Sequence, residues 1–366
     1  LLSVTMNDGV MLRSDNESKD NSSEDKSNYK VVQKGDMVYN SMRMWQGANG
    51  ISPYNGIVSP AYTVLMPKQQ INNYYFAAFF KTYKLINEFR KNSQGMTSDT
   101  WNLKYPQIKT IKVCVPSIQE QDKIADMICI LDKRIALQEQ LVDTLKKYKR
   151  GLSDALFEVI AKNQNVNEYR FEDIMELLQN NTFSRDELIL KGDGIKNIHY
   201  GDILIKYGAS IDIHKDKIPV IKSDVSVKKY SFKSYLKNGD VVFADTAEDY
   251  AVGKATEIVN AEGHQILSGL HTIPCRPKKH FAPMFLGYYF NSSLYRTQIY
   301  PIVQGTKVSS ISKSEIVKTK IIVPPELMQK QIASILYAID IRIDAAEKQK
   351  EAFDNLRHGL LQQLFI

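Results

Sequence analysis

The stretch PSIQEQDKIADMICILDKRIALQEQLVDTLKKYKRGLSDALF, residues 116–157, returns without a gap as PPELMQKQIASILYAIDIRIDAAEKQKEAFDNLRHGLLQQLF, residues 324–365. Each residue has its partner 208 positions later, and 12 of the 42 positions are identical. A repeat this long indicates a molecule built as two similar halves, so we expect its ligand to present two related sites. The identical positions in the first copy are Pro116, Gln121, Ile124, Ala125, Asp132, Arg134, Ile135, Glu139, Gly151, Leu152, Leu156 and Phe157.

Each copy is predicted to form one long amphipathic helix. Apolar residues recur at alternating spacings of four and three, which keeps a single stripe facing a partner helix. The stripe of the first copy contains Ile124, Ile128, Leu131, Ile135, Val142, Leu145, Leu152 and Leu156, and that of the second contains Ile332, Leu336, Ile339, Ile343, Ala346, Phe353, Leu360 and Leu364. Neither helix could bury its stripe alone, so we predict an intramolecular coiled coil. Antiparallel packing is favoured because the intervening segment must connect the end of one helix to the start of the other. Two unrelated core helices are the alternative.

The repeat continues more weakly ahead of each helix. VQKGDMVYNSM, residues 32–42, resembles LKNGDVVFADT, residues 236–246, and both patterns are typical of a turn followed by a strand. An aromatic, helix-like run follows in each half, at residues 74–83 and 284–295. Next come a glycine and a polar loop, from Gly95 and from Gly305, and then an apolar strand that leads to Pro116 or Pro324.

These patterns predict an α+β fold with a pseudo-twofold internal repeat: two mixed α/β domains separated by two long helices that pack as an antiparallel coiled coil. The expected bounds are 1–115 for the first domain, 116–158 for the first helix, 159–323 for the second domain and 324–366 for the second helix. The first domain is about 47 residues shorter than the second, and we interpret it as incomplete at its N-terminus. The acidic, serine-rich residues 14–28 are expected to form a solvated loop.

Composition and missing motifs restrict the function. The formal charge of +7 and the pI of about 8.9 are compatible with nucleic-acid binding. The three cysteines have no metal-type spacing, and there is neither a long apolar run nor a signal peptide, so we expect a cytoplasmic protein with reduced thiols. No phosphate loop, dinucleotide-binding glycine motif, hydrolase elbow or zinc-type histidine pair occurs. The chain is therefore predicted to position a ligand and to leave bond-making to partners.

Two helix signatures carry a resemblance to a known family. The helices open with PSIQEQDKIADMICILDKRI and PPELMQKQIASILYAIDIRI, and they end with GLSDALF and GLLQQLF. In these signatures, and in the twofold order of domain and long helix, the chain resembles the DNA specificity subunit of type I restriction-modification systems. The resemblance covers nearly the whole chain.

The resemblance implies a subunit without catalysis or cofactor of its own. Each target recognition domain would read one half of a split double-stranded DNA sequence, and the paired helices would act as a spacer and as the dock for two methyltransferase subunits. Those partners would bind S-adenosylmethionine and methylate adenine. Restriction and translocase subunits, which use ATP and Mg, could join them. No catalytic, cofactor-binding or metal-binding residue is expected in this chain.

Candidate DNA-contacting residues follow from side-chain chemistry. Arg, Asn, Gln and small hydroxyls distinguish base edges, whereas Lys mostly holds phosphates. In the first domain the candidates are Arg43, Trp45, Gln46, Thr97, Ser98 and Lys104; in the second they are Lys206, Tyr207, Thr246, Tyr250, Lys254, Lys307, Ser309, Ser310 and Lys313. The alternative for each is an ordinary surface-loop residue, and for Trp45 a core residue. Asp99, Asp245 and Glu248 are interpreted as acceptors for cytosine or as partners of a lysine, and not as metal ligands.

Two other classes of function stay open at this point. One is a protein-interaction scaffold with two ligand-binding heads on a coiled coil, which would show almost no salt dependence with DNA. The other is an enzyme whose site is assembled from dispersed residues, which would transfer methyl groups or cleave DNA as the isolated chain.

Overall fold

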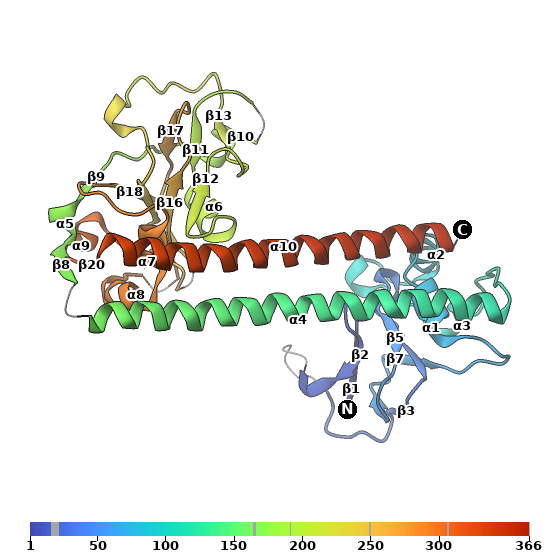
Figure 1. Cartoon of the computed structure of the whole chain (residues 1–366). Coiled ribbons are helices and arrows are strands. Elements are labelled where there is room, and N and C mark those ends of the chain that lie inside the picture. Colours follow the sequence, from blue (N-terminus) through green and yellow to red (C-terminus); the bar gives the residue numbers. More distant parts are fainter. Residues whose placement is uncertain (16–21, 164–165, 191, 249, 306, 366) are drawn as a thin grey trace. The chain divides into compact units, whose positions relative to one another are not determined.

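The computed structural model describes residues 1–15, 22–163, 166–190, 192–248, 250–305 and 307–365, so residues 16–21 of the expected solvated loop lie outside the described residues. The chain divides into two compact units, which Figure 1 shows in sequence colours. Unit 1 contains Leu1–Val142 and Ala345–Ile366, and unit 2 contains Asp143–Asp344. Each unit therefore includes part of both long helices.

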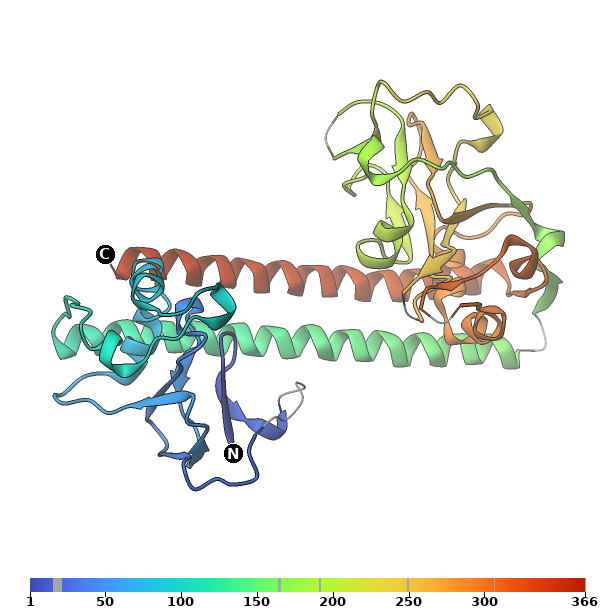
Figure 2. The same ribbon diagram turned by 180° about the vertical axis from the view of Figure 1, so that it is seen from behind.

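The two long helices are α4 (Ile118–Lys162) and α10 (Glu326–Leu364). In unit 1 the Gln138 side chain donates to the carbonyl of Ala346 over 3.0 Å, and Asp132 pairs with Arg357. In unit 2, Lys149 pairs with Asp340 at 2.5 Å. Further along α4 in the same unit, Phe157 and Ile160 share a core with Ile332 and Leu336 of α10. In each unit, higher residue numbers on α4 therefore meet lower numbers on α10, and Figure 2 shows the two helices running in opposite directions, so the predicted antiparallel pairing is confirmed.

The predicted apolar stripe is covered by the other helix and, near the helix ends, by the aromatic core of each unit. Its members are largely buried, and burial of a Leu or Ile side chain stabilises a fold by roughly 1.5–3 kcal/mol. The buried members are Ile124, Ile128, Leu131 and Val142 on α4 and Ile332, Leu336, Ile339, Ile343 and Ala346 on α10. The polar residue Gln138 is also buried there, where its hydrogen bond to a carbonyl satisfies the amide and helps to fix the register.

One identical residue of the repeat, a glutamine near the start of each long helix, makes the same two contacts in both units. Gln121 donates to the carbonyl of Pro116 over 2.9 Å and accepts from the backbone N–H of Asn72 over 3.0 Å. Its repeat partner Gln329 donates to the carbonyl of Pro324 over 2.8 Å and accepts from the backbone N–H of Ala282 over 3.0 Å. One glutamine in each copy therefore ties the start of a long helix to the short aromatic helix of the same unit.

The end of each long helix packs in the unit that contains the start of the other one. Phe365, at the end of the second copy, lies 5.0 Å from Tyr75 and 5.3 Å from Phe79 in unit 1. Phe157, at the end of the first copy, lies 6.3 Å from Phe285 and 5.9 Å from Tyr289 in unit 2. The repeated GLxxxLF ending thus supplies a phenylalanine to each aromatic core.

The rest of unit 1 is a small α+β domain. Its sheets have the strand orders β1-β2, β3-β6 and β5-β4-β7. The strands are β1 (Leu2–Thr5), β2 (Gly9–Leu12), β3 (Lys30–Val32), β4 (Met37–Asn40), β5 (Asn49–Ile51), β6 (Gly56–Val58) and β7 (Tyr62–Leu65). The short helices are α1 (Asn73–Phe79), α2 (Tyr83–Asn92) and α3 (Tyr105–Ile108), with the 3₁₀ turns η1 (Arg13–Asp15), η2 (Met44–Gln46) and η3 (Ser98–Thr100).

The rest of unit 2 is a larger α+β domain with sheets β12-β16-β14-β18-β9, β10-β13-β11-β17, β15-β19 and β20-β8. The strands are β8 (Asn167–Arg170), β9 (Met175–Leu177), β10 (Leu188–Ile189), β11 (Lys196–Ile198), β12 (Ser210–Asp212), β13 (Val220–Ile221), β14 (Val241–Ala244), β15 (Thr246–Ala247), β16 (Ala255–Val259), β17 (Ile266–Ser268), β18 (Thr272–Pro277), β19 (Ser309–Ser310) and β20 (Lys320–Val323). The short helices are α5 (Phe171–Ile174), α6 (Tyr200–Ile205), α7 (Phe285–Asn291), α8 (Ser293–Ile299) and α9 (Lys313–Ile316), with 3₁₀ turns η4 (Arg185–Glu187), η5 (Phe232–Ser234) and η6 (Tyr300–Ile302).

The repeated strands keep the same register in both units. In unit 1, β4 pairs with β7 so that Met37 lies opposite Leu65. In unit 2, β14 pairs with β18 so that Val241 lies opposite Cys275. The Gly-Asp turn ahead of each strand also repeats, with Gly35 at φ 96° and Gly239 at φ 81°. Positions in one unit can therefore be matched to positions in the other.

Two details differ from the sequence-based expectation. Each aromatic run forms two helices, because Thr82 and Ser292 accept a backbone N–H with their side chains and start a new helix. Residues 112–115, expected to form a strand, have no strand conformation. In unit 2 the equivalent strand β20 pairs with β8, whereas no described strand pairs with residues 112–115; apolar side chains alone do not hold an extended segment in a sheet.

Candidate nucleic-acid interface

In unit 1, backbone hydrogen bonds bring together the two loops in which we predicted DNA contacts. The N–H of Leu103 donates to the carbonyl of Ser41 over 2.8 Å, just after β4. Gln94 and Asn102 exchange two backbone hydrogen bonds, of 3.0 and 2.8 Å, and so close the polar loop between them. The N–H of Ser41 donates to the carbonyl of Ala61 over 3.2 Å. We call these four hydrogen bonds the frame of unit 1.

Unit 2 has the same frame. The N–H of Ile311 donates to the carbonyl of Asp245 over 2.8 Å, and the N–H of Asp245 donates to the carbonyl of His271 over 3.1 Å. Gln304 and Ser310 exchange hydrogen bonds of 2.9 and 2.8 Å. The loop after β14 and the polar loop after α8 are therefore fixed side by side, as in unit 1.

A glycine is required in each polar loop. Gly95 has φ 149° and Gly305 has φ 101°, conformations that side chains disfavour. A Cβ on Gly95 would lie 2.6 Å from the carbonyl oxygen of Thr100, and one on Gly305 would lie 2.0 Å from that of Val308. The loop backbone folds closely over both glycines, so neither position accepts a side chain without a shift of the loop.

Trp45 lies at the junction of the two loops of unit 1. Its ring meets Trp101 edge to face at 5.2 Å, the guanidinium of Arg90 lies 5.7 Å from its centre, and its indole N–H donates to the carbonyl of Met42 over 3.1 Å. The side chain is half-buried, so Trp45 is neither a fully exposed loop residue nor a core residue, the two alternatives that the sequence left open. Its neighbour Arg43 is exposed.

The other candidates of unit 1 lie at different places. Thr97, Ser98 and Lys104 are exposed on the polar loop, and the Thr97 N–H donates to the Thr100 hydroxyl over 3.1 Å. Gln46 instead lines a hollow of about 1100 Å³ that also borders α1, α4 and α10. The structure thus brings Trp45 together with the polar loop but directs Gln46 towards the long helices.

In unit 2 six candidates lie on or beside the strand pair β15-β19 and its two loops. Thr246 lies opposite Ser310, and Ala247 lies opposite Ser309. Lys313, at the start of α9, donates to the side-chain oxygen of Asn180 over 2.9 Å. Tyr250, with 87% of its surface exposed, and Lys307 project from the two loops. Hydroxyls, cations and an exposed ring thus share one part of this unit.

Three candidates of unit 2 have structural partners. Lys206 pairs at 2.8 Å with Asp202, whose side chain is fully buried. Lys254 donates to the carbonyl of Leu204 over 3.0 Å, and burial lowers its pKa. Tyr207 is 5% exposed and packs in an apolar core, so its ring is not on the surface that we expected. Tyr207 comes from the segment that the first domain lacks, and Lys254 is half-buried beside α6.

A cationic cluster surrounds Asp202. Arg185 makes two hydrogen bonds to this carboxylate, of 2.6 and 2.7 Å, and Lys206 adds the ion pair. Burial alone would raise the pKa of Asp202, but these hydrogen bonds outweigh it and lower the pKa. Burial and the nearby Arg185 lower the pKa of His199. The outward sides of Arg185 and Lys206, each about half exposed at 48% and 47%, carry positive charge at the surface.

Sequence reasoning missed several residues that the fold places at these loops. Arg90 and Trp101 complete the Trp45 cluster, Asn180 holds Lys313, and His271 lies beside Thr246. The sequence contained a usable signal for His271. This residue lies in the segment 267–278, which matches residues 58–68 of the first half, so the repeat already placed it next to a repeated strand. Asn180 precedes the repeated segment, and no pattern marks it.

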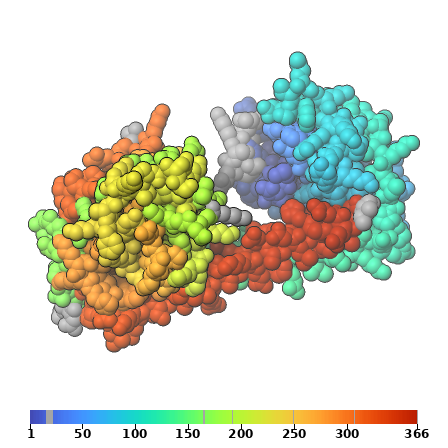
Figure 3. All heavy atoms as spheres, turned by 90° about the horizontal axis from the view of Figure 1, so that it is seen from above, coloured from blue at the N-terminus to red at the C-terminus, as the bar shows by residue number. Residues whose placement is uncertain are grey.

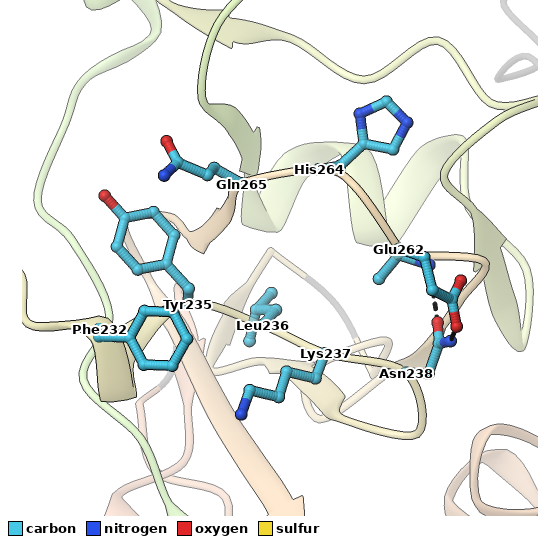
Figure 4. A pocket seen from close by; sticks show the side chains of 9 residues that line it. Phe232, Tyr235, Leu236, Lys237, Asn238, Glu262, His264 and Gln265 are labelled. Atoms are coloured by element: carbon cyan, nitrogen blue, oxygen red, sulfur yellow. Dashed lines mark hydrogen bonds between the residues drawn. The ribbon is translucent and has the colours of Figure 1, made fainter.

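A second hollow, of about 370 Å³, lies on unit 2 beside η5 and the turn before β17. Figure 4 shows Phe232, Tyr235 and Lys237 on one side and His264 and Gln265 on the other, with Asn238 bonded to Glu262. None of the candidate residues lines this hollow. Among the described residues, no group of three or more His, Cys, Asp or Glu side chains could hold a metal ion. Within the same part of the chain, no helix is long and apolar enough to cross a membrane.

Comparison with known proteins defines the class. Residues 6–147 and 163–352 match the model of the type I restriction modification DNA specificity domain. Because these two stretches make up most of the chain, the protein belongs to this family. The resemblance inferred from the helix signatures is thereby confirmed, and so is the α+β fold with two long helices.

The individual proteins that the chain resembles are type I specificity subunits as well. The chain is 22% identical to the putative type I restriction enzyme MjaX specificity subunit of Methanocaldococcus jannaschii, over 93% of this chain and 80% of that one. It is 23% identical to the MjaIX specificity subunit of the same organism, over 82% and 70%. Its fold is similar to the crystal structure of a type I restriction-modification S subunit from M. genitalium, with a TM-score of 0.57, 14% identity and coverage of 92% and 84%. A chain from a type I R-M system studied for complex assembly gives a TM-score of 0.56 at 15% identity, covering 93% and 84%.

Proposed function

We propose that this chain is the DNA-reading subunit of a type I restriction-modification complex and that it recognises a bipartite target. Each unit would read one half-site of the duplex. The paired helices would set the spacing between the half-sites, which face the same side of B-DNA when they lie about 34 Å apart. The domain limits 1–115, 116–158, 159–323 and 324–366 describe the two reading domains and the two spacer helices in this proposal.

The observation that carries the proposal is the repeated frame. Both units use the same backbone hydrogen bonds to hold a short loop after the central strand beside a glycine-containing polar loop. The side chains on these loops are hydroxyls, cations and exposed rings, which are suited to base edges and phosphates. Two copies of one frame with different side chains suit a target made of two different halves.

The proposed contacts follow from exposure. Arg43, Thr97, Ser98 and Lys104 in unit 1 are free to reach DNA. In unit 2 the corresponding group is Thr246, Tyr250, Lys307, Ser309, Ser310 and Lys313, with Lys206 as a phosphate contact beside Arg185. Trp45 would shape the reading loop of unit 1. Gln46, Tyr207 and Lys254 support the structure in this proposal.

The helices would also bind the partner subunits. In unit 1, α4 exposes a second apolar stripe on a side that the antiparallel pairing leaves free. Figure 3 shows the same chain as spheres, in sequence colours. The stripe consists of Met127 (47% exposed), Ile130 (59%), Leu137 (64%) and Leu141 (44%). Exposed apolar surface of this kind marks a protein interface. We propose that two methyltransferase subunits dock on the helix pair and that up to two restriction subunits join them.

In this division of labour the chain holds no cofactor and performs no chemistry. S-adenosylmethionine would belong to the methyltransferase partner, and ATP and Mg to the restriction partner. A scaffold for two protein ligands is the competing function, and the excess of positive charge, +7, favours DNA over it.

Salt dependence distinguishes the two functions. The purified chain is titrated with fluorescent duplex DNA of random sequence at 50 and 200 mM salt. If its cations neutralise about six phosphates, the affinity should fall roughly 1,000-fold between these concentrations. An affinity that changes less than about twofold, or no measurable binding at 50 mM salt, would favour the protein scaffold.

A further inference from the structure

The matched registers of the two units identify equivalent positions on the frame. Asn40 lies opposite Tyr62 in unit 1, and Ala244 lies opposite Thr272 in unit 2. Ser41 therefore corresponds to Asp245, and Ala61, just before β7, corresponds to His271, just before β18. The backbone hydrogen bond between these positions is the same in both units, at 3.2 and 3.1 Å. The side chains are chemically different.

In unit 2 the two frame positions and Thr246 form a polar trio. The Thr246 hydroxyl donates to Oδ1 of Asp245 over 2.8 Å. Nδ1 of His271 lies 3.4 Å from the Thr246 hydroxyl and 3.4 Å from the same Asp245 oxygen. The imidazole is 47% exposed and the carboxylate 23% exposed. The trio is therefore accessible from solvent and connected internally.

The backbone at His271 supports a functional role. Its φ of 54° lies in the left-handed region, where a residue other than glycine is uncommon. Such conformations cost of order 1 kcal/mol and gather at functional sites. The ring is held from the other side by Tyr200, edge to face at 5.3 Å. The fold thus retains a histidine in a disfavoured conformation and fixes its orientation.

Unit 1 has no such trio. Ala61 has no polar side chain, and Ser41 is only 6% exposed, with its hydroxyl 3.1 Å from that of Thr63. The counterpart of Thr246 is Met42, which is 41% exposed, and the neighbouring loops of unit 1 carry the aromatic pair Trp45 and Trp101. The same frame therefore presents a polar trio in one unit and an aromatic pair in the other.

We propose that Asp245, Thr246 and His271 are the specificity-determining group of unit 2, and that His271 reads a base. This inference rests on the proposed reading of DNA. The Thr246 hydroxyl donates to Asp245, so we assign a proton to Nδ1 of His271, which faces the Thr246 hydroxyl and Oδ1 of Asp245 at 3.4 Å each; this tautomer leaves Nε2 as an acceptor. An acceptor beside a carboxylate suits the exocyclic amino group of cytosine or adenine in the major groove.

The test maps modified adenines in a genome that carries the intact system, with the wild-type chain and with His271→Ala or Thr246→Val. We expect one half of the motif to lose its preference at one or two positions, while the other half and the gap stay unchanged. His280→Ala is the matched control, because it removes a histidine of the same unit that is 75% exposed and lies outside the trio. It should leave the motif intact.

His271→Asn is the control for misfolding, because asparagine tolerates the left-handed conformation and keeps a polar side chain. This variant should fold and should alter the preferred base in the same half-site. If the wild type gives a bipartite motif and neither folded His271 variant changes it, the inference about the trio is wrong and the proposed function stands. If the wild type gives no bipartite motif, the proposed function itself fails.

Discussion

Glu257 is a carboxyl group buried in unit 2, only 2% exposed, where it accepts the backbone N–H groups of Met284 and Gly287 over 2.7 and 3.0 Å. Burial raises its pKa to about 7, although both N–H groups act in the opposite direction. The folded protein therefore holds a proton on Glu257 at pH values where the unfolded chain has lost it. The side chain links β16 to the start of α7 at the centre of the domain.

This shift predicts a pH-dependent stability. The stabilising effect of the proton is complete below about pH 4.5 and is lost as the pH rises through about 7. Glu257→Gln removes the titrating group, so the difference in free energy of unfolding between variant and wild type should change by up to about 3 kcal/mol across this window. Urea titrations at pH 5 and pH 8 measure it. A difference that is the same at both pH values would contradict the assignment.

Two exposed lysines of unit 2 are predicted to contact phosphates. Lys307→Gln and Lys313→Gln should each weaken binding to random duplex DNA and reduce the slope of log affinity against log salt by about 1. Lys162→Gln is the matched control, because this lysine is 74% exposed at the end of α4 and pairs only with Glu158 among the described partners. An equal change in slope for Lys162→Gln would show a general charge effect and not a defined interface.

For single residues, the sequence predicted the chemical type of a side chain at the loops better than it predicted where that side chain lies in the fold. Thr246, Ser309 and Ser310 were selected as hydroxyls on loops, and the structure brings them together in one strand pair. Tyr207, the candidate from the segment that the first domain lacks, lies in the core. Burial depends on which distant segment covers a residue, and one sequence does not contain that information.

At the element scale, the ends of the long helices hold the aromatic cores together. Phe365→Ala removes a ring that is stacked on Phe79 and should cost about 3–5 kcal/mol in unit 1. Phe157→Ala should do the same in unit 2, where Phe157 is fully buried. Hydrogen exchange of the whole chain measures the effect separately in α1 and α7. Each variant should lose protection mainly in one of them, and the same pattern in both variants would contradict the reciprocal packing.

The glycines of the polar loops give a second prediction at this scale. Gly305→Ala should displace its loop, because the new Cβ would lie 2.0 Å from a carbonyl oxygen, and it should weaken DNA binding at least tenfold. Gly359→Ala is the matched control, because it lies within α10 with no atom near its Cβ and should stabilise that helix by about 0.5–1 kcal/mol. Binding and thermal unfolding are measured for both. Unchanged binding of Gly305→Ala would separate this loop from the interface.

Elements were predictable where local pattern decides them. The long helices could be predicted from their apolar stripes, because each stripe needs a partner helix and the other copy is the partner that matches it. Each aromatic run breaks into two helices at Thr82 and Ser292, because these side chains cap the N-terminus of the second helix. The preference of Thr and Ser for this position is a signal that the sequence itself contains. The strand expected at residues 112–115 fails because a strand needs a neighbour, and the neighbour is not specified locally.

At the scale of the whole molecule, the repeat explains both the architecture and its internal differences. The identical residues build the helix pair and its contacts with each aromatic core, as Gln121 and Gln329 show. The residues that differ, such as Ala61 and His271, lie on the shared frame. The repeat therefore predicted the common scaffold, whereas the proposed reading surface could be located only from the structure, because it is made of positions at which the copies differ.

We propose that the two units read two halves of one DNA target at a fixed spacing. Single-molecule sequencing of modified adenines in a genome that carries the intact system tests this directly. We expect a bipartite motif whose two specific halves flank a gap of constant length. A contiguous palindrome, or two half-motifs separated by variable gaps, would contradict it.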